Sequence, residues 1–272
     1  MIKLLCIDMD GTLLSTNKEI SERNLENIKA ASEKGVKIVV CTGRVFSSAN
    51  FYSELIGVKA PVIASNGAYI REKDRDDVIY KGLLGIGNCK KVLSICKKYG
   101  LYVHFNTSNT IFTEEIIYSS KYYLKLNETL PEGSKIGIQL VEDWEKIFKL
   151  NKDEILKCIV QDVDDDKIQA AKTELQKIET MEVVSSCEKN FEVMNKGVSK
   201  GNAVQILAKY YGMIREEVMC IGDNENDISM IKFAGVGVAM GNGTELVKEN
   251  ADFVTDTNDN DGVAKVIQKF IL

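Results

Sequence analysis

The chain has 272 residues, of which 44% are hydrophobic, so it can bury the core of one large or two smaller domains. Its formal net charge of −5 argues against nucleic acid or an anionic membrane as a partner, because both require a basic surface. No apolar run approaches the roughly 20 residues of a membrane span, no targeting segment is visible, and the seven cysteines include no C-x-x-C pair, so we expect a cytoplasmic protein.

Short apolar runs alternate with amphipathic stretches near both ends of the chain. The apolar runs predict strands at residues 2–7, 36–41, 61–64, 217–221, 236–239 and 253–255. The amphipathic stretches predict helices at residues 21–34, 199–211, 228–233, 244–250 and 262–270. Strands that are apolar throughout are typical of a parallel sheet covered on both faces. The pattern therefore predicts an α/β core with a doubly wound, Rossmann-like parallel sheet.

The middle of the chain has a different pattern, because its apolar runs alternate more with polar and charged residues. Here we predict strands at residues 101–107, 135–141, 155–162 and 182–185, and helices at residues 88–99, 116–127 and 165–179. We interpret this region as an α+β domain inserted into the first. The predicted core then comprises residues 1–83 and 194–272, and the predicted insert comprises residues 84–193.

Two carboxylates, Asp8 and Asp10, directly follow the first predicted strand. Carboxylates at the end of a buried strand are costly unless something uses them. Ligands of open α/β sheets bind at the carboxyl ends of the strands. One interpretation is a nucleophilic aspartate with a partner aspartate beside a hard cation; the alternative is a polar turn formed by Asp10 and Gly11.

Two further segments offer phosphate-binding groups. Thr42, Gly43 and Arg44 follow the second strand, where a hydroxyl and backbone N–H groups can hold a phosphate oxygen or simply cap a helix. Lys200 lies near the start of a predicted helix, against the preference of the helix dipole for anions. A phosphate among neighbouring carboxylates would explain that position, whereas a solvated surface lysine is the simpler alternative.

The last segment is an acidic loop at residues 222–227, after another apolar strand. Asp223 could bind a metal ion and Asp227 could support that ligand from behind, or the loop could only cap the following helix. Most of the polar segments described follow a predicted strand of the same sheet. They can therefore meet at one edge of it.

Together these segments resemble the motifs of the haloacid dehalogenase-like superfamily. Those motifs are an Asp-x-Asp-x-Thr loop, a Thr or Ser after the next strand, a Lys, and an acidic Gly-Asp-x-x-x-Asp loop, in the order found here. The long insert and the Ser-Asn-Gly-Ala segment at residues 65–68 resemble the Cof-like branch, which has a large α/β cap domain. The resemblance implies a Mg²⁺-dependent phosphatase that hydrolyses a small phosphorylated metabolite, a sugar phosphate or similar, through an aspartyl-phosphate intermediate.

The resemblance also implies roles for single residues. Asp8 would be the nucleophile and Asp10 the general acid and base. Mg²⁺ would be held by Asp8, the main-chain carbonyl of Asp10 and Asp223, with Asp227 behind them. The residues expected to contact phosphate or substrate are Met9, Thr42, Gly43, Arg44, Lys200 and Asn226.

Two other functions stay open from the sequence: a sugar phosphomutase, and a catalytically silent phosphate-binding regulatory protein. The intact set of motif residues argues against the silent protein. We expect substrate specificity to reside in the cap, a small-molecule phosphomonoester as the partner, and a monomer or weak dimer. The single histidine, His104, falls on a predicted cap strand, and we interpret it as a structural or surface residue rather than a catalytic one.

Overall fold

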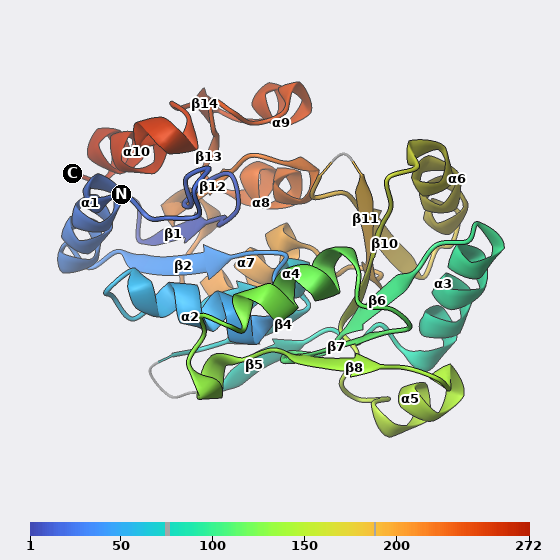
Figure 1. Ribbon diagram of the computed structural model, residues 1–272. Coiled ribbons are helices and arrows are strands. Elements are labelled where there is room, and N and C mark those ends of the chain that lie inside the picture. Colours follow the sequence, from blue (N-terminus) through green and yellow to red (C-terminus); the bar gives the residue numbers. More distant parts are fainter. Residues whose placement is uncertain (74–76, 188) are drawn as a thin grey trace. The chain divides into compact units, whose positions relative to one another are not determined.

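The computed structural model describes residues 1–73, 77–187 and 189–272, which divide into two compact units (Figure 1). The first unit comprises residues 1–43, 49–80 and 199–272. The second comprises residues 44–48 and 81–198. Among the described residues, no helix is both long and apolar enough to span a membrane.

In the described part of the chain, the first unit contains an eight-stranded sheet in the order β14-β13-β12-β1-β2-β3-β4-β5. The pairings from β14 to β3 are all parallel, and β4 runs antiparallel to β3. The strands are β1 (Leu4–Ile7), β2 (Lys37–Cys41), β3 (Val62–Ala64), β4 (Tyr69–Arg71), β5 (Val78–Lys81), β12 (Val218–Gly222), β13 (Val236–Ala239) and β14 (Phe253–Val254). The predicted parallel α/β core is therefore confirmed.

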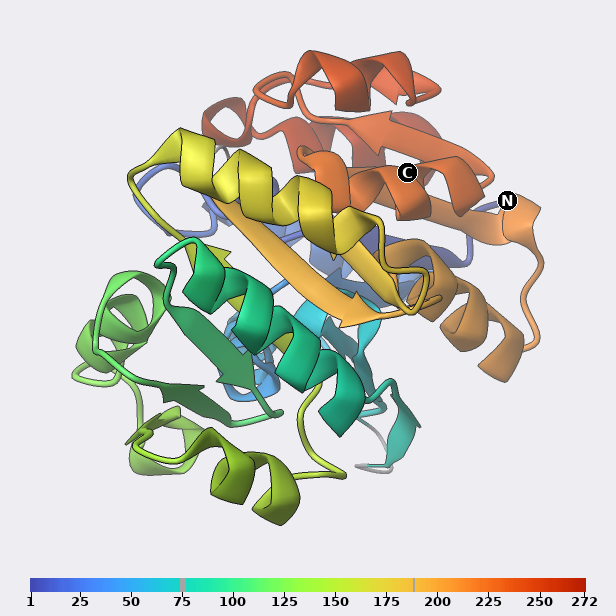
Figure 2. The same cartoon turned by 90° about the vertical axis from the view of Figure 1, so that its right-hand side faces the viewer.

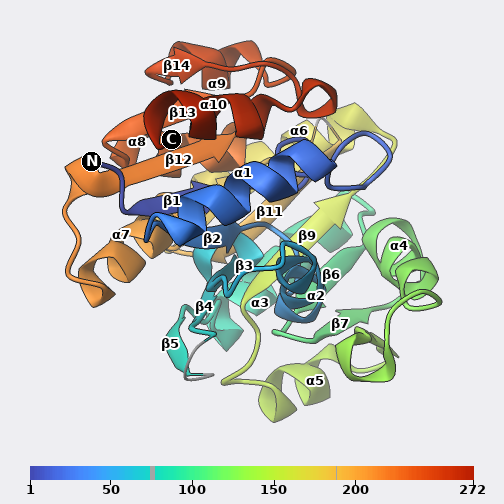
Figure 3. The same ribbon diagram turned by 90° about the vertical axis from the view of Figure 1, so that its left-hand side faces the viewer.

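Helices cover this sheet because its central strands are apolar on both faces; every residue of β1 and β12 is buried. The helices are α1 (Glu22–Glu33), α7 (Lys200–Tyr210), α8 (Ile228–Phe233), α9 (Glu245–Glu249) and α10 (Gly262–Phe270). Helix α2 (Phe46–Leu55) begins in the second unit and belongs to the first from Ala49 onward. Helices α1 and α10 pack against each other (Figure 3), as do α7 and α8. Ser21 and Ser199 cap α1 and α7 by accepting a backbone N–H three residues later.

The second unit has a sheet of its own, in the order β10-β11-β9-β6-β7-β8 within the described residues. Its pairings are antiparallel apart from that of β7 with β8. The strands are β6 (Val103–Asn106), β7 (Thr110–Thr113), β8 (Gly137–Leu140), β9 (Lys157–Gln161), β10 (Met181–Val184) and β11 (Asn190–Asn195). The helices are α3 (Ile86–Lys98), α4 (Tyr118–Leu126), α5 (Trp144–Leu150) and α6 (Asp165–Gln176).

Helices α3 and α6 lie across one face of this second sheet (Figure 2), and their apolar side chains join those of α5 and the strands in one core. An aromatic cluster lies within it: the ring of Phe105 lies 5.2 Å from that of Trp144 and 5.1 Å from that of Phe148. Of the α-helices and strands in the described residues, the sequence prediction missed six: α2, α5, β4, β5, β7 and β11.

Candidate active site

Three carboxylates gather at the carboxyl ends of the neighbouring strands β1 and β12. Asp8 follows β1, is buried, and donates its backbone N–H to the carbonyl of Ile221 at 3.0 Å. Asp223 and Asp227 lie in the loop after β12. Each of the three offers an oxygen that lies within 4.8 Å of the others. The structure thus brings together the predicted nucleophile and both predicted acidic residues of the last loop.

Lys200 links two of these three carboxylates. It lies in the first turn of α7, and its side chain is fully buried. Its Nζ atom donates to Asp8 Oδ1 at 2.6 Å and to Asp227 Oδ1 at 2.5 Å. Burying three charges is tolerated only when they pair this closely. The alternative of a solvated surface lysine is therefore excluded.

The loops that carry the carboxylates interlock through short contacts. Asp227 Oδ2 accepts hydrogen bonds from the backbone N–H groups of Asp223 and Asn224 at 2.9 and 3.0 Å. Asp227 thus holds the backbone that carries the Asp223 side chain in place. Thr12 Oγ1 donates to Asp223 Oδ1 at 2.8 Å. Gly11 has a positive φ of 85°, and a Cβ atom there would lie 2.4 Å from Asp223 Oδ2, so only glycine fits.

The electrostatics of the group favour a cation. Burial raises the pKa of Asp8 well above its usual range, the charge of Asp227 adds to this, and Lys200 opposes it. Burial also raises the pKa of Asp223 to about 7, again with Asp227 contributing. Burial alone would lower the pKa of Lys200, but Asp227 and Asp8 together raise it well above 10.5. Because one lysine does not offset three carboxylates, these oxygen ligands fit a divalent cation.

Asp10 does not belong to this group of carboxylates. Its side chain is 40% exposed and accepts a hydrogen bond from Lys18 Nζ at 2.9 Å. Lys18 has a positive φ of 64°, and its loop is anchored where Thr16 donates its backbone N–H and hydroxyl to Asp259 at 2.8 and 2.6 Å. No local sequence pattern predicts the contact between Asp10 and Lys18.

Thr42 and Asn226 lie close to the same edge of the sheet. Thr42 is buried after β2, and its carbonyl accepts the backbone N–H of Asn66 at 3.0 Å. The Nδ2 atom of Asn226 donates to Asn66 Oδ1 at 3.1 Å. Met9, between Asp8 and Asp10 in sequence, is fully buried.

Arg44 is placed differently from its neighbours in sequence. Gly43 ends a segment of the first unit, whereas Arg44 begins the short segment that belongs to the second. Its Nη1 atom donates to Ser48 Oγ at 3.3 Å, and its guanidinium lies 5.7 Å from the ring centre of Tyr122. Arg44 is therefore a residue of the second unit and does not belong to the cluster of Asp8, Asp223 and Asp227.

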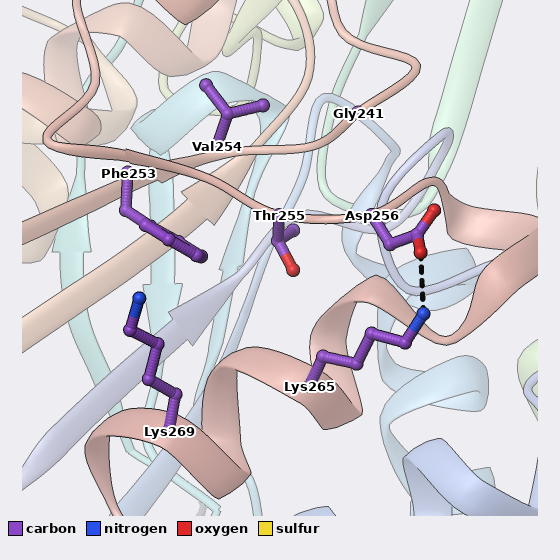
Figure 4. Close-up of a pocket in the computed structure, with 7 residues that line it drawn as sticks. All are labelled: Gly241, Phe253, Val254, Thr255, Asp256, Lys265 and Lys269. Carbon is purple, nitrogen blue, oxygen red and sulfur yellow. Dashed lines mark hydrogen bonds and ion pairs between the residues drawn. The ribbon is translucent and has the colours of Figure 1, made fainter.

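A separate pocket of about 400 Å³ is lined by β14, by residues that follow β13 and β14, and by α10 (Figure 4). Lys265 points from α10 toward Asp256, with 2.5 Å between Nζ and Oδ2. Lys269 lies over the ring of Phe253, 3.7 Å from its centre. Both lysine side chains thus have partners inside the pocket. None of the residues that line the pocket belongs to the cluster of Asp8, Asp223 and Asp227.

His104 lies on β6 of the second unit and is fully buried. Its Nε2 atom is 3.2 Å from Ser120 Oγ, and its Nδ1 atom has no hydrogen-bond partner among the described residues. Burial lowers the pKa of His104 to about 4. A histidine that stays neutral at physiological pH and lies inside this sheet fits the predicted structural role.

We expect His104 to make the protein sensitive to acid. The folded pKa of about 4 lies below the unfolded value of 6.5, so the unfolded state binds more protons between these values. The contribution of neutral His104 to the free energy of unfolding is complete above pH 6.5. It is lost as the pH falls toward 4, and the total loss is up to about 3 kcal/mol. Urea unfolding at pH 7 and pH 4.5 checks this: His104→Gln should lose less stability on acidification than the parent. An equal loss in both proteins would contradict it.

Comparisons with known proteins agree with this geometry. A family model described as haloacid dehalogenase-like hydrolase matches residues 5–267. The chain belongs to the haloacid dehalogenase-like hydrolase family. It is 33% identical over 271 residues to the 5-amino-6-(5-phospho-D-ribitylamino)uracil phosphatase YcsE of Bacillus subtilis. The alignment covers 100% of this chain and 96% of that protein.

Solved structures of haloacid dehalogenase-like proteins have the same fold. One such hydrolase from B. subtilis is 29% identical, with a TM-score of 0.88, over 99% of this chain and 100% of that one. The subclass IIB sugar phosphatase BT4131 is 27% identical, with a TM-score of 0.81, over 98% of both chains. This haloacid dehalogenase-like protein is thus a phosphoric monoester hydrolase of the Cof-like branch.

Proposed function

We propose that this phosphatase is Mg²⁺-dependent and acts through an aspartyl-phosphate formed on Asp8. The observation that carries the proposal is the buried group in which Lys200 binds both Asp8 and Asp227. Lys200 fixes the orientation of the Asp8 carboxylate through its Oδ1 atom. A carboxylate that is buried, oriented and held beside a cation-binding group has the properties of a nucleophile for phosphorus.

The metal ligands in this proposal are Asp8, Asp223 and the main-chain carbonyl of Asp10. Asp227 keeps the loop of Asp223 in place through the two backbone N–H groups it accepts. When bound, Mg²⁺ supplies the positive charge that lets a carboxylate approach an anionic phosphate. Oxygen ligands of this kind suit Mg²⁺.

The chain's own residues carry the steps of the proposed reaction. A carboxylate oxygen of Asp8 forms a bond to phosphorus as the bond to the leaving oxygen breaks, and Asp10 gives that oxygen its proton. Asp10 then takes a proton from the water that attacks phosphorus, and the bond between phosphorus and the Asp8 oxygen breaks, which releases phosphate and restores the Asp8 carboxylate. Lys200, Thr42 and Asn226, with the backbone of Met9 and Gly43, would hold the phosphoryl oxygens and stabilise their charge.

For the substrate, we propose the phosphate ester of a polyol or sugar. The relatives YcsE, YitU and YwtE of B. subtilis are named for a substrate with a phosphorylated ribityl chain, and BT4131 is named a sugar phosphatase. In both cases the phosphate ester is part of a polyhydroxylated chain or ring. We propose that residues 84–193 form a cap that selects among such leaving groups, with Arg44 as a further substrate contact, in a cytoplasmic monomer or weak dimer.

The proposed function is tested by incubating the purified protein with a panel of phosphomonoesters and measuring phosphate release. We expect hydrolysis of ribityl and sugar phosphates with release of inorganic phosphate. Isomerised sugar phosphate without free phosphate would identify a phosphomutase instead, and no conversion of any substrate would leave a phosphate-binding protein.

Removal of divalent cations should lower turnover by roughly 100-fold or more, because the charge on phosphate is then no longer offset. Added Mg²⁺ should restore it. Asp227→Asn should raise the Mg²⁺ concentration needed for half-maximal turnover by about 10- to 100-fold, since Asp227 supports the loop of Asp223. Asp252→Asn, in an exposed loop outside the carboxylate group, is the control and should need the parent's Mg²⁺ concentration. Full turnover after exhaustive chelation would refute the metal requirement.

A further inference from the structure

The turn Ser65–Gly67, which follows β3, has an unusual backbone. Its three consecutive residues have positive φ values of 51°, 55° and 96°. Residues with side chains adopt this region singly, and asparagine tolerates it better than serine. The turn is buried, and the hydroxyl of Ser65 has no hydrogen-bond partner within the described part of the chain. A costly conformation of this kind persists where the position of a side chain matters.

The turn contacts three segments of the proposed phosphate site. The backbone N–H of Asn66 donates to the carbonyl of Thr42 at 3.0 Å. Gly67 lies against the start of α7, where a Cβ atom would be 2.3 Å from the carbonyl oxygen of Ser199, the residue before Lys200. The side chain of Asn66 accepts a hydrogen bond from Asn226 Nδ2 at 3.1 Å.

We propose that Asn66 is a positioning residue, which holds the carboxamide of Asn226 in the orientation that phosphate binding needs. The nitrogen of a carboxamide carries two hydrogens in one plane. Asn66 Oδ1 accepts one of them, which fixes that plane and therefore the direction of the second N–H. The inference rests on the proposed function, in which Asn226 binds a phosphoryl oxygen. Asparagine tolerates a positive φ and also offers a side-chain oxygen that accepts a hydrogen bond. Neither glycine nor alanine has such an oxygen.

The variant Asn66→Gly removes the acceptor and leaves the backbone free to keep its positive φ. It should lower kcat/KM for p-nitrophenyl phosphate, and weaken inhibition by inorganic phosphate, by about tenfold, the usual worth of one hydrogen bond that orients a group. Asn226→Ala should have a larger effect on both. The double variant should match Asn226→Ala alone, because Asn66 then has nothing to orient.

The control is Asn24→Ala, which removes a buried carboxamide that accepts the backbone N–H of Ala264 in the same unit. Asn24→Ala should lower the melting temperature and leave kcat/KM unchanged. Asn66→Gly should lower kcat/KM and leave the melting temperature unchanged. Effects of Asn66→Gly and Asn226→Ala that multiply in the double variant would overturn the inference, as would a change in kcat/KM of less than about twofold for Asn66→Gly.

The proposed function and this inference fail in different ways. If the parent protein binds inorganic phosphate in calorimetry but hydrolyses no ester, the proposed function is wrong. The same set of variants, measured as phosphate affinity, then still decides whether Asn66 orients Asn226. A parent protein that neither hydrolyses esters nor binds phosphate would overturn both.

Discussion

Replacing Asp8 with asparagine is expected to lower kcat by roughly 10⁴-fold or more, as the loss of a catalytic nucleophile does in other hydrolases. The carboxamide has the same shape and can still accept a hydrogen bond from Lys200, but it is a poor nucleophile. The substitution also removes a charge whose burial raises the pKa of Asp8 well above its usual range. We therefore expect Asp8→Asn to keep a melting temperature close to that of the parent.

The measurement is phosphate release from p-nitrophenyl phosphate together with a thermal melt. Asp252→Asn, which neutralises an exposed carboxylate that accepts the N–H of Gly237, serves again as the control and should keep the parent's turnover. Turnover of Asp8→Asn within about tenfold of the parent would remove Asp8 from the reaction. A large fall in melting temperature would show instead that the loss came from unfolding.

Replacing Lys200 with methionine is expected to destabilise the protein by about 3–5 kcal/mol, because two buried carboxylates lose their partner. Lys200 lies between Asp8 and Asp227, and its side chain is 0% exposed, so water cannot replace it. Turnover should fall as well, since Lys200 orients Asp8. The double variant Lys200→Met with Asp227→Asn should recover much of the stability, because one unpaired charge is gone, but none of the turnover.

Urea unfolding in the presence of a chelator measures these stabilities without a bound cation. Lys265→Met is the matched control, because that lysine pairs with Asp256 at the surface, with side chains 40% and 41% exposed. Loss of such a pair should cost at most about 1 kcal/mol. If Lys200→Met were as stable as the parent, or the double variant no more stable than the single one, the buried charge group would not have the energetics described.

Much of the first unit could be predicted because its strands are continuous apolar runs. A run such as that of β12 favours a buried parallel strand, and polar residues right after it mark the edge where ligands bind. For Lys200 the sequence left two alternatives open, a solvated surface lysine and a lysine beside a phosphate and carboxylates. Asp8 and Asp227 are those carboxylates in the structure.

The missed elements lack a clear local pattern. Helix α2 contains three serines and an asparagine, so it has no strong apolar stripe, and α5 has only seven residues. Strand β11 contains Glu192, which is depleted in strands, yet here its carboxylate is buried in an ion pair with Lys157 of β9. Contacts with neighbouring strands decide such cases, and they cannot be seen in a single segment.

The fine geometry of the site could not be predicted for a related reason. The contact of Asp10 with Lys18, and that of Asn226 with Asn66, depend on loops with positive φ values that no periodicity reveals. Arg44 was grouped with Thr42 because they are close in sequence. The structure assigns Arg44 to the other unit, since its packing partner Tyr122 lies there.

The most direct test of the proposed mechanism is to trap the phosphorylated enzyme. The protein is mixed with a phosphorylated substrate and Mg²⁺, quenched in acid within one turnover, and digested for mass spectrometry. We predict one phosphoryl group on Asp8 that appears and disappears at rates compatible with kcat, and none on the Asp8→Asn variant. Normal phosphate release with no phosphoryl group on Asp8, or with one on another residue, would contradict the account.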